Sequence, residues 1–398
     1  MNNIDYQYPV AQASAIPYPY KGDDEDKVTG PSPAPTAQGL TPAFSLSCLS
    51  KDGLSEDQIN QLVQQGFTRG LAQAVGESIE VFPLRVWIVD NSGSMSHNDG
   101  NRFVETSNTS DVKVVQCTRW KEIQETVEYH ARMAALLKAP TIFRLLNNPG
   151  LRVGPQTFGV ADKGEHLIDS DLQLALTTIS NASPSGVTPL CRHIYEIREQ
   201  VLLLTPRLNA EGRKVSIIIA TDGLPTDEHG YGGSQRKTEF TAALRSLEGL
   251  PVWIVIRLCT DEEDVVEFYN DLDSQLELSL EVLDDFMGEA QEVYGCNKWI
   301  NYSLPMHRCR EMGFHHRLFD LLDERKFTKG ELREFCHLML GKNQFDGVID
   351  PEEDFDKFSS QVQKMIQKEK KPWNPNKRHV TPIMDLDKYK GGSSCTIM

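Results

Sequence analysis

The chain lacks the sequence features that define several large classes of protein. Its longest apolar segments, such as residues 215–220, are far shorter than the roughly 18 residues that a membrane-spanning helix requires. The N-terminal residues contain neither a basic region nor an apolar core, so we expect no secretory signal. Eight cysteines are present but no C-x-x-C pair, which excludes a RING domain and indicates reduced thiols in the cytosol. P-loop and protein-kinase motifs are also missing.

The net charge of −16 is distributed unevenly along the 398 residues. Acidic residues dominate up to residue 360, whereas residues 361–398 carry eight lysines or arginines against three acids. Because an acidic core repels a phosphate backbone, we expect no nucleic-acid partner. Residues 1–45 combine proline, tyrosine, serine and an acidic patch with few large aliphatic side chains, which predicts a disordered leader.

Three segments that are far apart in the sequence carry oxygen-bearing side chains. One apolar run ends at Asp90, and Ser92 and Ser94 follow it on a tight loop. A second apolar run ends at Asp222, and Thr188 lies between the two runs in a Gly-Val-Thr-Pro context. Two carboxylates and three hydroxyls provide an oxygen shell suited to Mg²⁺ or Mn²⁺, in which the hydroxyls add ligands without adding charge. An open position on such an ion would accept a carboxylate from a partner.

These residues resemble the signature of the von Willebrand factor A domain with its metal-ion-dependent adhesion site. The family pattern is D-x-S-x-S, then a distant threonine, then a distant aspartate in a T-D-G context. The chain matches it in order at Asp90, Ser92, Ser94, Thr188 and Asp222. The resemblance implies an α/β fold with a doubly wound, mostly parallel sheet flanked by helices, and a site that binds Mg²⁺ or Mn²⁺.

The pattern of apolar residues predicts the same fold class. Residues 214–220 and 252–259 are almost continuously apolar, as expected for strands covered on both faces. We assign residues 46–300 to this domain, beginning with a lead-in helix at about residues 56–74. An additional segment at residues 96–118, polar and then strand-like, follows the metal loop. We expect this segment to gate the site, to supply specificity or to block access.

Residues 301–370 are predicted to form a small helical module. The segment Lys342–Glu353 resembles the second half of an EF-hand loop, but Lys342 and Gln344 stand where the first ligands should be, so we expect no Ca²⁺. Histidines and cysteines are numerous here without zinc-finger spacing, and we expect them to be core or surface residues. They are Cys296, His307, Cys309, His315, His316, Cys336 and His337.

Residues 371–398 are predicted to form a basic flexible tail that ends in a prenylation motif. Cys395 is followed by Thr-Ile-Met, a C-a-a-X pattern whose final methionine favours a farnesyl group. One lipid chain needs a second signal for lasting attachment, and the basic residues of the tail can provide it. We therefore expect a cytoplasmic protein held peripherally at the cytosolic face of a membrane.

Two functions of different classes fit this sequence. The first is a non-enzymatic adhesion or scaffold protein that binds, through its metal ion, a protein ligand presenting an acidic side chain. The alternative is a metal-dependent hydrolase or phosphoryl-transfer enzyme that uses Asp90 and Asp222. We favour binding, because Asp90 is followed by Asn-Ser where a haloacid-dehalogenase-type hydrolase would place a second aspartate.

Overall fold

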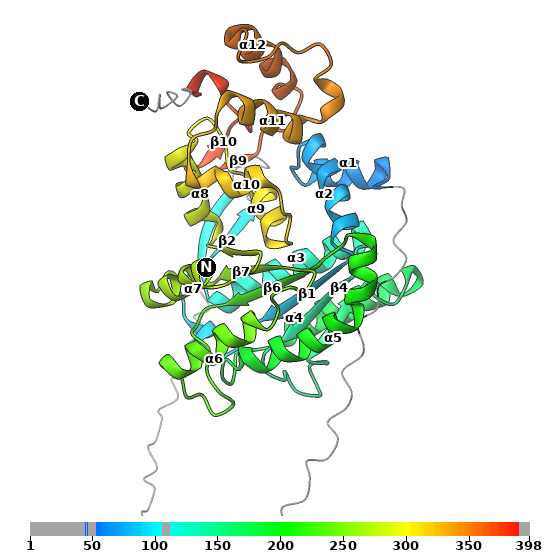
Figure 1. Ribbon diagram of the computed structural model, residues 1–398, viewed down its shortest axis with the longest axis vertical. Helices are drawn as coiled ribbons and strands as arrows, with labels where there is room; N and C mark the ends of the chain where they lie inside the picture. The colour runs from blue at the N-terminus through cyan, green and yellow to red at the C-terminus, as the bar shows by residue number, and fades with distance from the viewer. Residues whose placement is uncertain (1–43, 45, 47–52, 106–111, 390–398) are drawn as a thin grey trace, which may run out of the picture. The chain divides into compact units, whose positions relative to one another are not determined.

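A six-stranded β-sheet forms the framework of the computed structural model (Figure 1). Its strands are β1 (Leu84–Val89), β4 (Thr141–Leu145), β5 (Thr157–Val160), β6 (Val215–Thr221), β7 (Val252–Leu258) and β8 (Leu280–Leu283). Their order is β5-β4-β1-β6-β7-β8, with β5 antiparallel to β4 and the other neighbours parallel. Connections leave in opposite directions from the β1–β6 pair, which makes this pair the switch point of the sheet.

The structure describes residues 44, 46, 53–105 and 112–389 of the chain. The predicted disordered leader, residues 1–45, lies outside them except for position 44, and the predicted lipidation site, Cys395, also lies outside them. None of the described helices combines the length and the hydrophobicity needed to cross a bilayer.

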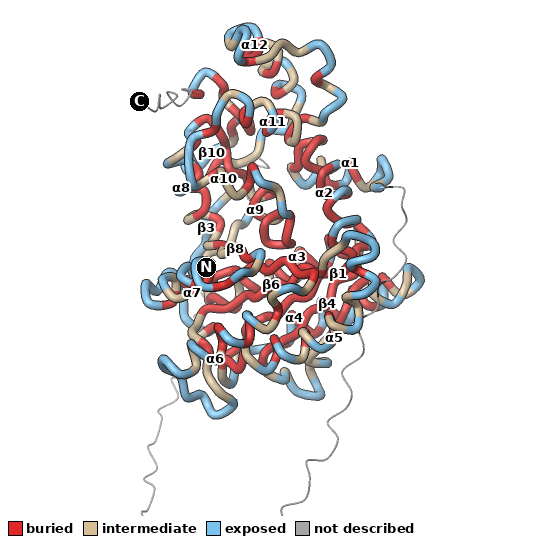
Figure 2. Tube along the Cα trace, viewed as in Figure 1, coloured by how far each residue is buried: buried red, intermediate tan, exposed pale blue. Residues whose placement is uncertain are grey.

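Helices cover both faces of the sheet. They are α3 (Arg119–Leu137), α4 (Ile168–Asn181), α5 (Leu190–Glu211), α6 (Ser234–Arg245) and α7 (Glu263–Gln275). In β1, Val86 and Ile88 pack in a buried cluster with α5, α6 and α7, whereas Trp87 and Val89 pack in another with α3 and α4. Figure 2 shows the strands buried along their length. The prediction of an α/β fold with a mostly parallel sheet flanked by helices is confirmed.

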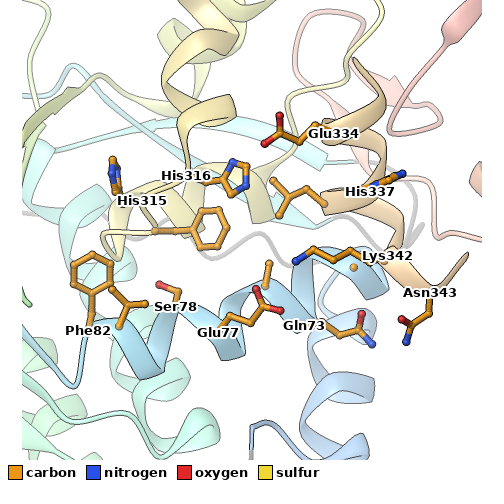
Figure 3. Close-up of a pocket in the computed structure, with 16 residues that line it drawn as sticks. Gln73, Glu77, Ser78, Phe82, His315, His316, Glu334, His337, Lys342 and Asn343 are labelled. Atoms are coloured by element: carbon orange, nitrogen blue, oxygen red, sulfur yellow. The ribbon is translucent and has the colours of Figure 1, made fainter. Parts of the chain in front are cut away.

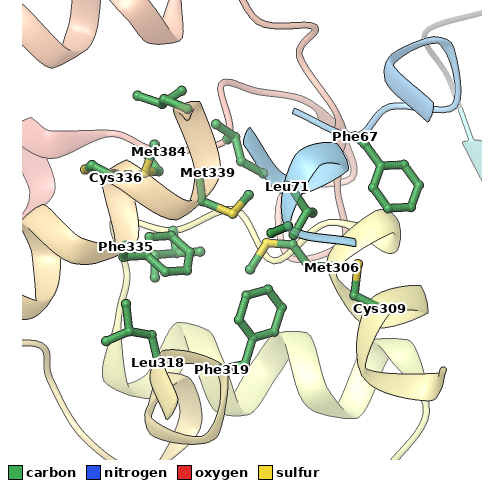
Figure 4. Packing of buried hydrophobic residues seen from close by; sticks show 14 of the residues in the cluster. Phe67, Leu71, Met306, Cys309, Leu318, Phe319, Phe335, Cys336, Met339 and Met384 are labelled. Carbon is green, nitrogen blue, oxygen red and sulfur yellow. Dashed lines mark hydrogen bonds between the residues drawn. The ribbon is translucent and has the colours of Figure 1, made fainter. Parts of the chain in front are cut away.

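A third buried cluster lies mostly outside the sheet and its helices, and Met133 and Leu137 of α3 connect it to them (Figure 4). Its helices are α1 (Glu56–Gln64), α2 (Arg69–Val81), α8 (Phe286–Cys296), α9 (Leu304–Glu311), α10 (Arg317–Glu324), α11 (Lys329–Leu340) and α12 (Phe355–Ile366). Leu71 of α2 and Phe335 of α11 are buried in this one cluster, so the two N-terminal helices pack with the C-terminal ones. We placed a domain boundary at residue 300. In the structure, α1, α2 and α8, which precede this residue, share a buried core with α9 to α12, which follow it.

Two segments differ from their predicted form. The single lead-in helix expected at residues 56–74 is divided into α1 and α2, because Gly66 turns the chain with a φ of 99° and Thr68 caps the second helix. The tail, expected to be flexible from residue 371, instead contains a short hairpin of β9 (Trp373–Asn374) and β10 (His379–Val380). After the hairpin, Ile383 and Leu386 are buried in the third core. We did not predict this packing, because the tail is rich in basic residues.

The additional segment at residues 96–118 forms an antiparallel ribbon. It consists of a short 3-10 turn at Gly93–Ser96, then β2 (Gly100–Glu105) and β3 (Val112–Cys117). Phe103 packs edge-to-face on Phe286, with ring centroids 5.0 Å apart, so the ribbon contacts the third core. Because α3 begins two residues after β3 ends, both ends of the ribbon lie next to the loop that follows β1.

Candidate metal site

The predicted metal ligands lie at the switch point of the sheet, where binding sites of α/β proteins usually form. Asp90 directly follows β1, and Asp222 directly follows β6. These strands pair in parallel, and the Asp90 N–H donates to the backbone oxygen of Ala220 at 2.9 Å. The register therefore places both aspartates at the same edge, where they are 0% and 1% exposed.

Hydrogen bonds connect four of the five predicted ligands. The hydroxyl of Ser94 donates to Asp222 Oδ1 at 2.8 Å, and Ser92 Oγ lies 3.0 Å from Ser94 Oγ. Asp90 Oδ1 accepts the backbone N–H of Ser92 at 2.8 Å, and its Oδ2 accepts the Thr221 hydroxyl at 2.7 Å. The loop after β1 thus brings the Ser94 hydroxyl against the Asp222 carboxylate, and the Ser92 hydroxyl against that of Ser94.

Thr188, the fifth predicted ligand, comes from a separate loop that docks on the first. The Gly93 N–H donates to the backbone oxygen of Gly186 at 3.2 Å, and the Ser185 N–H donates to that of Asn91 at 2.7 Å. Thr188 is buried just before α5 begins. Its hydroxyl forms no hydrogen bond with any residue that the structure describes, so its link to the other four ligands is through the backbone of the two loops.

Two asparagines hold these loops together, and the sequence analysis assigned no role to either. Asn91 Nδ2 donates to the backbone oxygen of Asn147 at 3.1 Å, and Asn91 Oδ1 accepts the Asn147 N–H at 2.8 Å. Asn147 Nδ2 in turn donates to the backbone oxygen of Val187 at 2.8 Å. Gly186 has a φ of 87°, and a Cβ there would lie 2.5 Å from Asn147 Oδ1, so only glycine fits this loop.

Arg119 is a buried cation at the site that sequence reasoning also missed. It is the first residue of α3, and its Nη1 donates to Asp222 Oδ2 at 3.0 Å. Its Nε and Nη2 donate to the two oxygens of Asp99 at 2.7 and 2.6 Å, and Nη2 also reaches Glu262 Oε1 at 2.8 Å. Asp99 precedes β2 and Arg119 follows β3, so the additional ribbon delivers both to the edge of the site.

The two aspartates differ from ordinary surface carboxylates in their protonation. Burial raises the pKa of Asp90 to about 6, and the charge of Asp222 adds to the rise, against hydrogen bonds from Thr221 and Ser92. Burial also raises the pKa of Asp222, although Ser94 and Arg119 oppose this. Hydrogen bonding to Asp99 raises the pKa of Arg119, which stays charged. The single positive charge of Arg119 thus does not balance the negative charges of Asp90 and Asp222, and a further cation would stabilise the two carboxylates.

An acidic cavity of about 270 Å³ opens beside Arg119. The carboxylates that line it come from the ribbon, from α3 and from the loops after β7 and β8. They are Asp99, Glu122, Asp261, Glu262 and Asp285. The surface next to the candidate site is therefore strongly negative.

A second group of acids is close enough to hold a metal ion and lies in the third core. It consists of Glu289, Glu292 and Asp323, whose carboxylate oxygens lie within 4.8 Å of one another. Arg310 already forms ion pairs with Glu289 and Asp323. Because a buried arginine compensates this group, it forms an ion-pair cluster that joins α8, α9 and α10.

Comparison with known proteins identifies no family for the chain. No protein-family model matches it, and no curated protein matches it. Among solved structures it is similar to a mutant of the PilB minor pilin from Streptococcus sanguinis, with 11% sequence identity and a TM-score of 0.32. The alignment covers 51% of this chain and 57% of the pilin chain. A similarity at this level carries no conclusion about fold family or function.

Proposed function

We propose that the chain is a metal-dependent protein-binding protein of the von Willebrand factor A type. In this proposal Mg²⁺ or Mn²⁺ is held by Asp90, Ser92, Ser94, Thr188 and Asp222. The observation that carries the proposal is the hydrogen-bonded contact between the Asp90 loop and Asp222 at the switch point of the sheet. A bound ion would supply a positive centre that binds an acidic side chain of the partner.

The residues present fit such an ion. Each carboxylate oxygen of Asp90 and Asp222 accepts a hydrogen bond, and a carboxylate oxygen has two lone pairs, so each retains a direction for a cation. The Thr188 hydroxyl has no partner within the described part of the chain and is available as a neutral ligand. Burial raises the pKa of both carboxylates, and the charge of Asp222 raises that of Asp90 further, so both gain from a divalent charge.

The surroundings of the site restrict the partner. An acidic side chain that approaches the ion also approaches Asp261 and Asp285 of this cavity, which form no ion pair with a described residue and repel it. Complementary potentials are a general requirement of specific interfaces. We therefore propose that the partner presents its acidic residue next to basic residues, which would pair with the cavity while the carboxylate binds the metal.

The membrane tether is a proposal that rests on the sequence alone. Cys395 lies outside the described residues, and the support for a farnesyl group is the C-a-a-X pattern together with the basic residues of the tail. With this tether, the metal site would act on a partner at the cytosolic face of a membrane.

Calorimetric titration with Mg²⁺ and Mn²⁺ tests the metal site directly. We expect saturable binding to the full chain, and Asp90→Ala should weaken it by at least about 100-fold because it removes a ligand rather than an outer-shell group. Asp169→Asn, which changes an exposed aspartate on α4, is the matched control and should leave binding unchanged. Absence of binding to the wild-type chain would refute the site.

Partner binding is tested by recovery from cell extract with Mg²⁺ or with chelator. Proteins that are retained by the wild-type chain in Mg²⁺, and lost with chelator and with Asp90→Ala, would be the metal-dependent partners. Turnover of a phosphoester that depends on Asp90 would instead favour the hydrolase alternative.

A further inference from the structure

A second cavity lies between α2 and α11, and it shares no residue with the metal site (Figure 3). Its volume is about 630 Å³, within the range of small-molecule pockets. A Cβ on Gly70 would overlap the backbone nitrogen of Gly341, so the absence of side chains lets the two helices touch there. From this contact the cavity extends along both helices to the loop between α9 and α10.

One end of this cavity is apolar. Val81, Phe82 and Phe314 line it, and α2 contributes its residues at helical spacing from Gly70 to Val81. Figure 3 shows Phe82 at the opposite end of the cavity from Asn343. An aliphatic or aromatic group of a ligand would be removed from water at this end.

The middle of the cavity carries one charge of each sign from opposite walls. Glu77 projects from α2 and Lys342 from the end of α11, and Figure 3 shows both charged groups directed into the cavity. Neither forms an ion pair with a residue that the structure describes. Glu334, on the same rim, differs because Arg317 pairs with it at 2.6 Å. Both residues are exposed, so the cavity presents a hydrated carboxylate opposite a hydrated ammonium.

Two buried polar atoms in the cavity wall are also without partners. Ser78 is 8% exposed, and neither its hydroxyl nor Nε2 of His337 has a hydrogen-bond partner among the described residues. A buried hydroxyl without a partner is uncommon and destabilising, and both atoms lie behind the accessible surface of the cavity, so a ligand would meet the accessible charged groups of Glu77 and Lys342 instead.

We propose that this cavity binds a small zwitterion with an apolar side chain, which is the chemistry of a free α-amino acid such as phenylalanine or leucine. Lys342 pairs with the carboxylate of the ligand, and Glu77 pairs with its ammonium group. The side chain of the ligand lies against Phe82 and Phe314.

The histidines of the cavity support a neutral balance of charge rather than a metal site. Burial lowers the pKa of His315, His316 and His337, so all three are uncharged at neutral pH. They are not among the described groups that come close enough together to hold an ion. One positive and one negative group therefore dominate, and a ligand of a single charge would leave one of them unpaired.

Titration with three related compounds tests this proposal on the full chain. L-phenylalanine has both charges, 3-phenylpropionate lacks the ammonium group, and phenethylamine lacks the carboxylate. We expect L-phenylalanine to bind with a Kd on the order of 1 mM or tighter, and each of the other two about fivefold more weakly. The absence of saturable binding of L-phenylalanine and L-leucine up to about 10 mM would overturn the proposal.

Variants then assign each charge. Glu77→Gln should weaken L-phenylalanine about fivefold and leave 3-phenylpropionate unchanged, and Lys342→Gln should weaken L-phenylalanine and leave phenethylamine unchanged. Glu80→Gln and Lys357→Gln, at exposed positions outside the cavity, are the matched controls. Thermal unfolding of each variant confirms that it folds. Binding that neither variant changes would refute the assigned contacts, whatever the outcome at the metal site.

Discussion

Glu311, at the end of α9, and Asp90, at the end of β1, are both completely buried, yet their surroundings are opposite. Glu311 Oε2 accepts from Arg308 Nη1 at 2.7 Å and from His130 Nε2 at 3.2 Å, and Arg257 Nε lies 3.6 Å from Oε1. Asp90 accepts only neutral donors in the described contacts, a backbone N–H and a hydroxyl. The first carboxylate is compensated by protein cations, and the second is not.

The pKa values of the two groups follow from this contrast. Burial alone would raise the pKa of Glu311, but the charge of Arg308 and contacts with His307 and His130 hold it well below its usual value. The pKa of Asp90 is raised to about 6. A buried carboxylate that the protein itself compensates joins parts of the fold, whereas one left uncompensated at a sheet edge indicates a place for an external cation.

Glu311 has such a joining role. Its neighbours come from α3, α9 and β7, so the network connects the third core to the sheet. Nearby, Arg85 Nε of β1 donates to the backbone oxygen of Met312 at 3.1 Å, and Arg310 Nε pairs with Glu281 of β8 at 2.6 Å. The segment around the end of α9 is therefore fixed to the sheet mainly by buried charged groups.

Neutralising the two carboxylates should have unequal effects on stability. We expect Glu311→Gln to lower the free energy of unfolding by about 3 kcal/mol, because Arg308 then lacks its carboxylate in the interior and Arg257 keeps only its ion pair with Glu122. The matched change Asp90→Asn should alter the stability of the metal-free chain by only about 1 kcal/mol. Urea denaturation in the presence of chelator measures the unfolding free energy of both variants. An equal decrease in the two variants would show that the two carboxylates do not differ in their contribution to stability.

Acid should abolish the contribution of Glu311. Because its folded pKa lies below the unfolded value near 4.5, the stability that it contributes is fully present above that pH and is lost as the pH falls through the folded pKa. The difference in unfolding free energy between the wild-type chain and Glu311→Gln should therefore be constant above about pH 5 and shrink below about pH 4.5. Denaturation curves across this range test it, and a difference independent of pH would contradict the assignment.

Arg119→Gln should make the metal site more negative. Asp222 would lose its cation, whereas Asp99 and Glu262, whose side chains are 54% and 56% exposed, would be hydrated, so we expect a loss of about 1–2 kcal/mol without metal. Affinity for Mg²⁺ should rise about tenfold, because a buried positive charge beside the ion is removed. Calorimetry measures the affinity, with Arg102→Gln on the ribbon as control. Unchanged or weaker affinity would show that Arg119 does not oppose the ion.

Cys395→Ser should have the smallest effect on the folded chain and a clear effect on its location. We expect the free energy of unfolding to change by less than about 0.5 kcal/mol, since serine differs from cysteine by a single atom. When cells are fractionated, the variant should be found in the soluble fraction and the wild-type chain in the membrane fraction. If the serine variant partitions like the wild-type chain, the proposed lipid anchor is refuted.

Local features of this chain were predictable because they depend on neighbours in sequence. Capping boxes are present at Ser55 and Thr328, with Gln58 and Glu331 three residues further on, a spacing that the sequence alone shows. The apolar runs became buried strands, and their order along the chain indicated a parallel sheet with the two aspartates at strand ends. The candidate site was predictable to the extent that its ligands belong to one short loop.

The sequence by itself determined which segments become strands and helices, and which oxygen ligands stand at the ends of β1 and β6, because periodicity and short motifs act over a few residues. Tertiary structure alone decided that Arg119 pairs with Asp222, that Asn147 supports the Thr188 loop, and that α1 and α2 share a core with residues up to 389. Long-range contacts of this kind join residues 40 to 300 positions apart. Such partners depend on how whole layers pack, so no local pattern in the sequence marks them.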